Sequence, residues 1–106
     1  MGNFEYIKLF WSHNFDDEPV IILYEVNLDD DRFAKRSVDI FADREIKNIN
    51  NLYDGAIEAV PVATVQDFNS GVFGKEFYAC KITGEEFEKI WNSHFYTGDL
   101  YIEQEV

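Results

Sequence analysis

Apolar and polar residues alternate in two runs that flank a short acidic break. The first run, residues 20–26, is the most apolar stretch of the chain, and the second covers residues 33–42. Three consecutive aspartates lie in the break, and buried carboxylates without partners are very costly. We therefore predict a β-hairpin over residues 19–41 with the aspartates at an exposed loop tip. Arg36 interrupts the apolar side of the second run, and we expect it to pair with a carboxylate such as Glu25 on the neighbouring strand.

The other apolar runs predict the rest of a sheet and two helices. Residues 4–11 are apolar on both faces, which favours a central strand. Further predicted elements are a short strand at 45–49, an extended segment or edge strand at 56–62, a short helix at 65–69, a strand at 77–82, a helix from 83 to about 95 and a short strand at 100–102. The fold class is therefore α+β: a largely antiparallel sheet of five or six strands with one main C-terminal helix packed on a face, in a single domain over residues 1–106.

The main helix has a clear start and a clear apolar stripe. Thr83 and Glu86 form a capping box, in which the Thr83 hydroxyl accepts from the Glu86 amide. Apolar residues follow at helical spacing, at Phe87, Ile90, Trp91 and Phe95. Such a stripe is typical of a helix that lies across a sheet.

Charge narrows the class of partner. The 106 residues include 46% hydrophobic and 17% aromatic residues, which is enough for one packed core. Acidic residues outnumber basic ones 21 to 9, so the net charge is −12. This charge repels nucleic acids and anionic membranes and attracts basic proteins. We therefore expect a basic protein partner; the alternative is that the charge serves only to keep the protein soluble.

Nothing in the sequence points to an oxidising compartment or a membrane. Cys80 is the single cysteine, so an intramolecular disulfide cannot form, and a buried role is expected for its thiol. The N-terminal residues do not resemble a secretion signal, and no segment approaches the roughly 20 apolar residues of a membrane-spanning helix. We expect a cytoplasmic protein.

Candidate chemistry centres on His13, which lies close to three carboxylates of residues 16–18. An imidazole with carboxylates could bind a divalent metal or act in acid-base catalysis, but the spacing fits no regular ligand set. The aspartates of residues 29–31 lack the later ligands of a calcium loop, and no catalytic or phosphate-binding motif occurs. We expect no enzyme activity, metal or cofactor; a small metal-dependent or acid-base enzyme that uses His13 is the alternative class.

Several separated blocks carry a family resemblance. They are Trp11-Ser-His13-Asn-Phe-Asp-Asp-Glu18-Pro19-Val, Leu23-Tyr24-Glu25, the basic pair before Val38-Asp-Ile-Phe41, then Pro61, Ile82, Glu86-Phe87-Glu88 and Trp91. Over about residues 5–92, the chain resembles a small bacterial family of uncharacterised domains. It departs from that pattern at Asn14, where the family has Asp, and at Arg44, where the family has Gly. Small acidic domains of this sort resemble the immunity proteins encoded beside bacterial toxins, including contact-dependent growth-inhibition systems.

The favoured function is therefore an immunity protein that neutralises a basic toxin domain, expected to be a nuclease, by electrostatic occlusion of its active site. A phage-type acidic inhibitor that mimics nucleic acid is the second hypothesis. The residues expected to meet the partner are Asp16, Asp17, Glu18, Tyr24, Glu25, Asp29, Asp30 and Asp31. Charges of this kind influence the association rate more than the final affinity.

Overall fold

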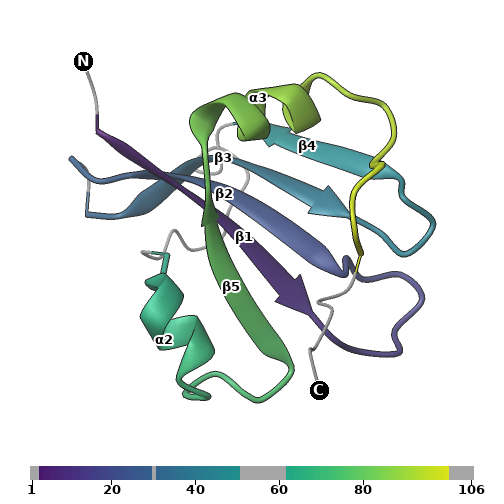
Figure 1. Cartoon of the computed structure of the whole chain (residues 1–106), viewed down its shortest axis with the longest axis horizontal. Coiled ribbons are helices and arrows are strands. Elements are labelled where there is room, and N and C mark those ends of the chain that lie inside the picture. Colours follow the sequence, from purple (N-terminus) through teal and green to yellow (C-terminus); the bar gives the residue numbers. More distant parts are fainter. Residues whose placement is uncertain (1–2, 30, 51–61, 101–106) are drawn as a thin grey trace.

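The fold is a five-stranded antiparallel sheet with two short helices, in the order β4-β3-β2-β1-β5 (Figure 1). The computed structural model describes residues 3–29, 31–50 and 62–100. The elements are β1 (Phe4–Trp11), β2 (Ile21–Asn27), β3 (Phe33–Ile40), β4 (Ile46–Asn50), α2 (Val65–Asn69), β5 (Phe77–Ile82) and α3 (Gly84–Trp91). The predicted α+β class and antiparallel sheet are confirmed.

The predicted hairpin is formed by β2 and β3. Glu25 stands directly opposite Arg36 in the register of these strands, and the register shifts after that pair, between Glu25 and Val26. The strand predicted to be central, β1, lies between β2 and β5. The predicted extended segment at 56–62 lies outside the described residues except for Val62, and the predicted strand at 100–102 lies outside them except for Leu100.

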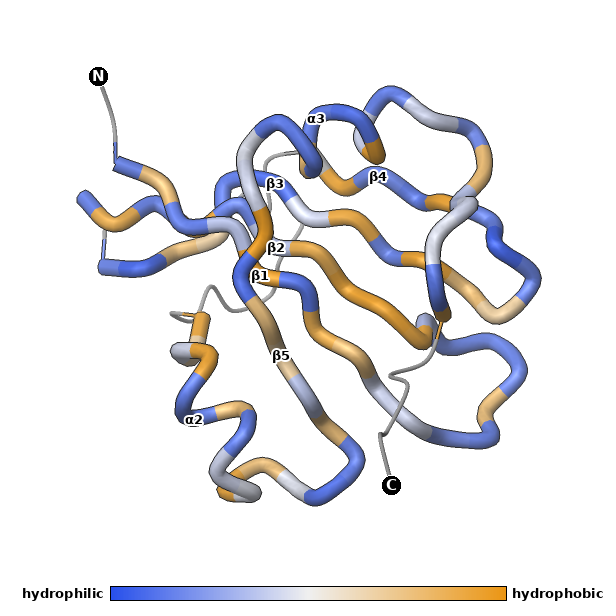
Figure 2. Tube along the Cα trace, in the orientation of Figure 1, coloured by the Kyte–Doolittle hydropathy of each residue, from blue (hydrophilic) through white to orange (hydrophobic). Residues whose placement is uncertain are grey.

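Each face of the sheet carries its own core, because successive side chains of a strand point to opposite faces. The α3 face has a buried cluster of Val20, Ile21, Leu23, Val38, Ile40, Phe87 and Tyr96. The α2 face has a buried cluster of Ile7, Leu9, Val26 and Ala79. Figure 2 shows the hydrophobic residues concentrated in the middle strands, while the connecting loops are mostly hydrophilic.

Helix α2 matches the predicted range and closes one edge of the sheet. Thr64 Oγ1 accepts from the amide of Asp67 at 3.1 Å, which caps the start of the helix. At its end, Asn69 Nδ2 donates to the carbonyl of Ala79 at 2.9 Å, and the amide of Ala79 donates to Asn69 Oδ1 at 2.6 Å. These bonds satisfy backbone groups of β5 that a further strand would otherwise use.

Helix α3 starts where predicted but is shorter than predicted. Thr83 Oγ1 accepts from the amide of Glu86 at 3.0 Å, as the capping box requires. The side chains of Asn92 and Ser93 donate to carbonyls of the last turn at 2.8 and 2.7 Å, which ends the helix. Phe95, predicted as part of the buried stripe, therefore lies beyond the helix and is 57% exposed.

Candidate functional site

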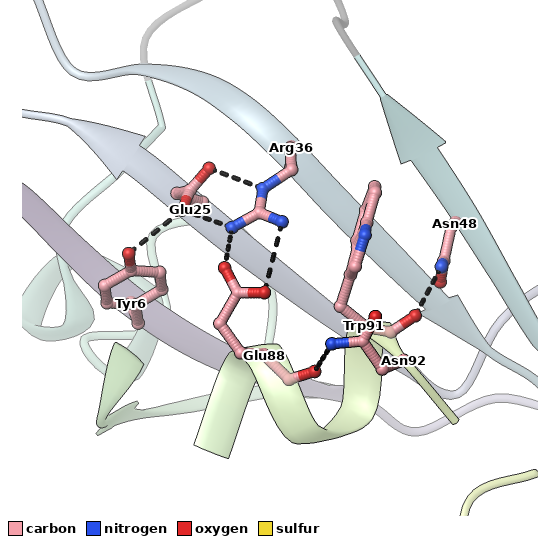
Figure 3. A network of polar contacts seen from close by, with 7 residues as sticks. All are labelled: Tyr6, Glu25, Arg36, Asn48, Glu88, Trp91 and Asn92. Atoms are coloured by element: carbon pink, nitrogen blue, oxygen red, sulfur yellow. Dashed lines mark hydrogen bonds and ion pairs between the residues drawn. The ribbon is translucent and has the colours of Figure 1, made fainter. Parts of the chain in front are cut away.

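The pair predicted between Arg36 and Glu25 forms the centre of a buried polar network. Arg36 Nε and Nη2 each donate to a Glu25 carboxylate oxygen at 2.7 Å, and the Tyr6 hydroxyl donates to Glu25 Oε2 at 2.9 Å (Figure 3). Arg36 also pairs with Glu88 of α3. The network therefore joins β1, β2 and β3 to the helix.

Aromatic rings complete the surroundings of Arg36. Its guanidinium carbon lies 4.9 Å from the centroid of the Phe87 ring and 4.7 Å from that of Trp91. Phe87 and Trp91 lie one helical turn apart, and their ring centroids are 6.0 Å apart in a stacked arrangement. Asn48 of β4 donates to the carbonyl of Trp91 at 2.7 Å. Ion pairs, cation–π contacts and this hydrogen bond together hold α3 on the sheet.

The electrostatics of this network give it a structural role. Burial by itself would raise the pKa of Glu25, but hydrogen bonds from Arg36 and Tyr6 and the Arg36 charge outweigh burial and lower that pKa. Burial, followed by the hydrogen bond to Glu25, raises the pKa of Tyr6 to about 12. Neither group changes protonation near neutral pH. Glu25 is 5% exposed, so it is an internal ion-pair residue rather than a surface charge.

The acidic residues expected to meet a partner lie at opposite ends of the sheet. Residues 16–18, all exposed, follow β1 and precede β2. Asp29 and Asp31, also exposed, follow β2, and Asp30 lies outside the described residues. One strand of seven residues separates the two loops, which corresponds to about 20 Å. The structure therefore places these carboxylates on two separate surfaces.

The loop after β2 makes several internal bonds. Asp29 Oδ2 accepts from the amide of Asn3 at 2.9 Å, and the amide of Asp29 donates to Asn27 Oδ1 at 3.0 Å. Asp31 and Arg32 have φ angles of 53° and 62°, in the left-handed region that β-turns often require. Part of the hydrogen-bonding capacity of Asp29 is thus used to hold the start of β1.

At the other end of the sheet, three loops form a strongly acidic surface, which we call the acidic end: residues 12–19, 41–45 and 72–76. The amide of Ser12 donates to the carbonyl of Glu76 at 2.9 Å, and the register of β2 and β3 brings the first two loops to the same end. Its exposed carboxylates are Asp16, Asp17, Glu18, Asp43, Glu45 and Glu76. Loops at one end of a rigid sheet are a usual position for binding residues.

Of the two basic residues in these loops, Arg44 is used internally. Its Nη1 donates to the carbonyls of Tyr96 and Gly98 at 3.0 and 2.6 Å. Arg44 has a φ of 74°, a conformation that glycine adopts more easily, and its side-chain bonds help to hold that conformation. The exposed Lys75 is the other cation, so the carboxylates of the acidic end are only partly compensated.

An aromatic ladder of Phe77, Trp11, His13 and Phe15 supports the acidic end. The Trp11 ring stacks on Phe77 with a centroid distance of 5.8 Å, and the Trp11 and His13 centroids are 4.2 Å apart. His13 and Phe15 follow at 5.3 Å. Phe15 is 63% exposed. Sequence reasoning did not select Phe15, although aromatic rings at positions 11, 13 and 15 share one side of an extended segment and could have indicated it.

Both ring nitrogens of His13 have backbone partners. Nε2 lies 2.7 Å from the carbonyl of Pro19, and Nδ1 lies 2.9 Å from the amide of Phe15. The carbonyl can only accept and the amide can only donate, so these two contacts fit the tautomer with a proton on Nε2 and a lone pair on Nδ1. Its Nδ1 lone pair is therefore engaged. Within the described ranges, no three His, Cys, Asp or Glu residues form a group that could hold a metal ion.

Tyr24 lies on the α2 face and is partly buried. Burial, followed by the charge of Asp39, raises its pKa to about 12. Burial also raises the pKa of Asp39; Lys47 opposes this effect, and Glu18 adds to it. Tyr24 is therefore a packed neutral phenol rather than a freely exposed contact residue.

Asp39→Asn is expected to increase the free energy of unfolding at pH 7, because it replaces a carboxylate whose ionised form is disfavoured by burial. Since the pKa of Asp39 is raised in the folded protein, its protonated form favours folding, and that contribution is lost as the pH rises through the folded-state pKa. The gain in the free energy of unfolding should therefore shrink below about pH 4, which is the pKa of an aspartate in the unfolded chain. Urea unfolding at pH 7 and pH 3.5 measures it, with exposed Asp43→Asn as the control. A less stable variant at pH 7 would contradict the expectation and make the electrostatic attraction between Asp39 and Lys47 the dominant effect.

A cleft of about 320 Å³ lies beside α3, between β1 and the segment that follows the helix. Lys8 lines it and donates to the Tyr96 hydroxyl, and the Lys8 ammonium lies 5.1 Å from the ring centroids of both Phe10 and Tyr96. Glu86 and Lys89 also line the cleft. Its charges are mixed, and Lys8 serves to fasten the segment around Tyr96 to the sheet.

These features define a small α+β domain with a five-stranded antiparallel sheet and a strongly acidic end. The chain belongs to the family described as Domain of unknown function (DUF6881), which it matches over residues 5–96. This match confirms the predicted membership of an uncharacterised family of small domains. No curated protein and no solved structure matches the chain significantly. Among the described residues, no helix has the length and apolar character needed to cross a membrane.

Proposed function

We propose that this protein acts as an immunity protein: it binds a basic bacterial toxin domain with nuclease activity and covers the nucleic-acid site of that domain with its acidic end. One observation carries the proposal. The acidic end presents six exposed carboxylates, while one of its two cations, Arg44, is bound to backbone carbonyls. The result is a concentrated negative surface on a rigid sheet.

Electrostatics explain why such a surface suits a nuclease. An enzyme that binds a phosphate backbone needs a positive site, and carboxylates can compete with phosphates for the same lysines and arginines. Opposite potentials also accelerate the encounter. The hypothesis of an acid-base enzyme centred on His13 has no comparable support, because both ring nitrogens of His13 are hydrogen-bonded to backbone groups of its own loop.

The position of the acidic loops allows a charge-matched test. Asp16→Asn with Asp17→Asn removes two charges from the acidic end. Asp29→Asn with Asp31→Asn removes two charges from the opposite end of the sheet. Both double variants have the same net charge, so a difference between them reports position and not total charge.

The experiment co-expresses this chain with a basic, toxic product of a neighbouring gene and scores cell survival, then measures association rates of the purified pair at low and high salt. We expect the wild-type chain to protect the cells. The acidic-end variant should associate about tenfold more slowly at low salt, while the control variant stays close to wild type.

Three outcomes would contradict the proposal. Failure of the wild-type chain to protect or bind would remove the immunity function. Equal slowing by the two double variants would remove the acidic end as the contact surface. Equal binding to unrelated nucleases would favour the second hypothesis, an acidic mimic of nucleic acid.

A further inference from the structure

We propose that Phe15 is the anchor of this interface and that it receives an arginine side chain of the basic partner. The inference rests on the proposed function and specifies the centre of the contact and the chemistry that it recognises. Phe15 is 63% exposed, and two carboxylates, Asp16 and Asp17, directly follow it in the loop. A large apolar ring among exposed charges is typical of an interface anchor with a charged rim.

The backbone of Phe15 is fixed before any partner binds, and its ring lies beside that of His13. The amide of Phe15 donates to His13 Nδ1 at 2.9 Å, and His13 is itself fixed by its bond to the carbonyl of Pro19 at 2.7 Å. Behind His13, the Trp11 ring stacks on Phe77. The partner therefore meets a loop whose backbone is already ordered, which lowers the entropy cost of ordering the loop on binding.

Arginine fits this surface better than lysine. A planar guanidinium can lie flat on an aromatic ring while its N–H groups point from the edge of the plane to carboxylates. The chain uses this same arrangement internally, where Arg36 lies over Phe87 and Trp91 and pairs with Glu25 and Glu88. The ammonium of a lysine is a compact point charge and gains less from combining the two contacts.

A second copy of this chain is a poor occupant for the same surface. Pairing two acidic ends would bring six exposed carboxylates of one molecule against the same six of the other. Like charges placed opposite one another across an interface are strongly unfavourable. Charge complementarity therefore favours a basic protein as the partner of this surface.

The test titrates 15N-labelled protein with two peptides of equal length, one with six arginines separated by glycines and one with six lysines in the same positions. We expect the arginine peptide to bind more tightly and to shift the amide signals of residues 12–18 and Glu76. Phe15→Ala should weaken binding of the arginine peptide roughly tenfold and remove most of the preference for arginine. Leu28→Ala, which removes a 42% exposed apolar side chain at the opposite end of the sheet, should change neither.

Phe15→Ala leaves every charge in place, so its effect separates the ring from the carboxylates. Equal affinity of the wild type for the two peptides, unchanged binding by Phe15→Ala, or shifts confined to the loop of Asp29 would each overturn the inference. We expect thermal unfolding of Phe15→Ala to match that of the wild type, because the ring that it removes is largely exposed.

Co-expression with the toxin domain keeps this inference separate from the proposed function. Absence of protection by the wild-type chain counts against the function. Protection by Phe15→Ala equal to that of wild type, with an unchanged dissociation rate, counts against the anchor and leaves the function standing. Faster dissociation of Phe15→Ala with an unchanged association rate supports the anchor.

Discussion

Arg36→Met is expected to lower the free energy of unfolding by about 3 kcal/mol, because it leaves the Glu25 carboxylate buried without its charged partner. The side chains of Glu25 and Arg36 are 6% and 17% exposed. The variant also loses the ion pair to Glu88 and the contacts with the rings of Phe87 and Trp91. Equilibrium unfolding in urea at pH 7 measures the loss.

A double variant shows how much of the lost stability comes from the unpaired carboxylate of Glu25. Arg36→Met combined with Glu25→Gln should recover a large part of the stability, since an uncharged amide replaces the unpaired charge. If the double variant is as unstable as the sum of the two single variants, the pair is not energetically coupled and the explanation is wrong.

The difference between the wild type and Arg36→Met should depend on pH. In the wild type the pKa of Glu25 is lower than its value of about 4.3 in the unfolded chain. The ionised carboxylate therefore stabilises the folded protein above about pH 4.3, and this contribution is lost as the pH falls through the folded-state pKa. In the variant, burial without Arg36 favours the protonated carboxyl. The stability difference between the two proteins should therefore narrow in acid.

Phe87→Ala is expected to cost about 4 kcal/mol, the largest effect of any single substitution proposed for this chain. Phe87 is fully buried on the α3 face, and its ring centroid lies 5.3 Å from that of Tyr6 and 6.0 Å from that of Trp91. Removing the ring leaves a cavity and takes away one of the two aromatic surfaces beside Arg36. The shift of the urea midpoint gives the measurement.

The matched control is Phe95→Ala, which removes the same group from a residue that is 57% exposed. We expect a change within about 0.5 kcal/mol for this control. Equal losses at the two positions would contradict the packing of α3 described above. Phe87 lies outside the loops of the acidic end, so its variant separates the stability of the scaffold from partner binding, whereas Phe95 forms a β-bridge with Glu45 of that end.

Local patterns were enough to predict most of the fold. The alternation of apolar residues in β1, β2 and β3 indicates which side chains face the same way, because the side-chain period of a strand is two. The same alternation placed Arg36 and Glu25 on one face of adjacent strands, and the structure confirms their pair. Thr83 and Glu86 likewise marked the start of α3, since capping depends on residues three positions apart.

The end of α3 and the arrangement of the candidate site were not predicted. The side chains of Asn92 and Ser93 donate to carbonyls of the last turn and end the helix there. Phe95 therefore lies beyond the helix and is exposed. The separation of the two acidic loops was implicit in the strand order, because a single strand connects them. The aspartates of residues 16–17 and of residues 29 and 31, predicted to meet the same partner, therefore belong to loops at opposite ends of β2.

The sequence by itself determined the antiparallel α+β sheet, the solvent-exposed carboxylates and the negative charge, because side-chain alternation and charge are local properties of the chain. Only the tertiary structure decided which carboxylates lie together, that Glu25 is internal, and that Phe15 stands on a ladder of rings. Those outcomes depend on pairings between distant segments, such as Ser12 with Glu76 and Trp11 with Phe77, which the folded sheet brings together.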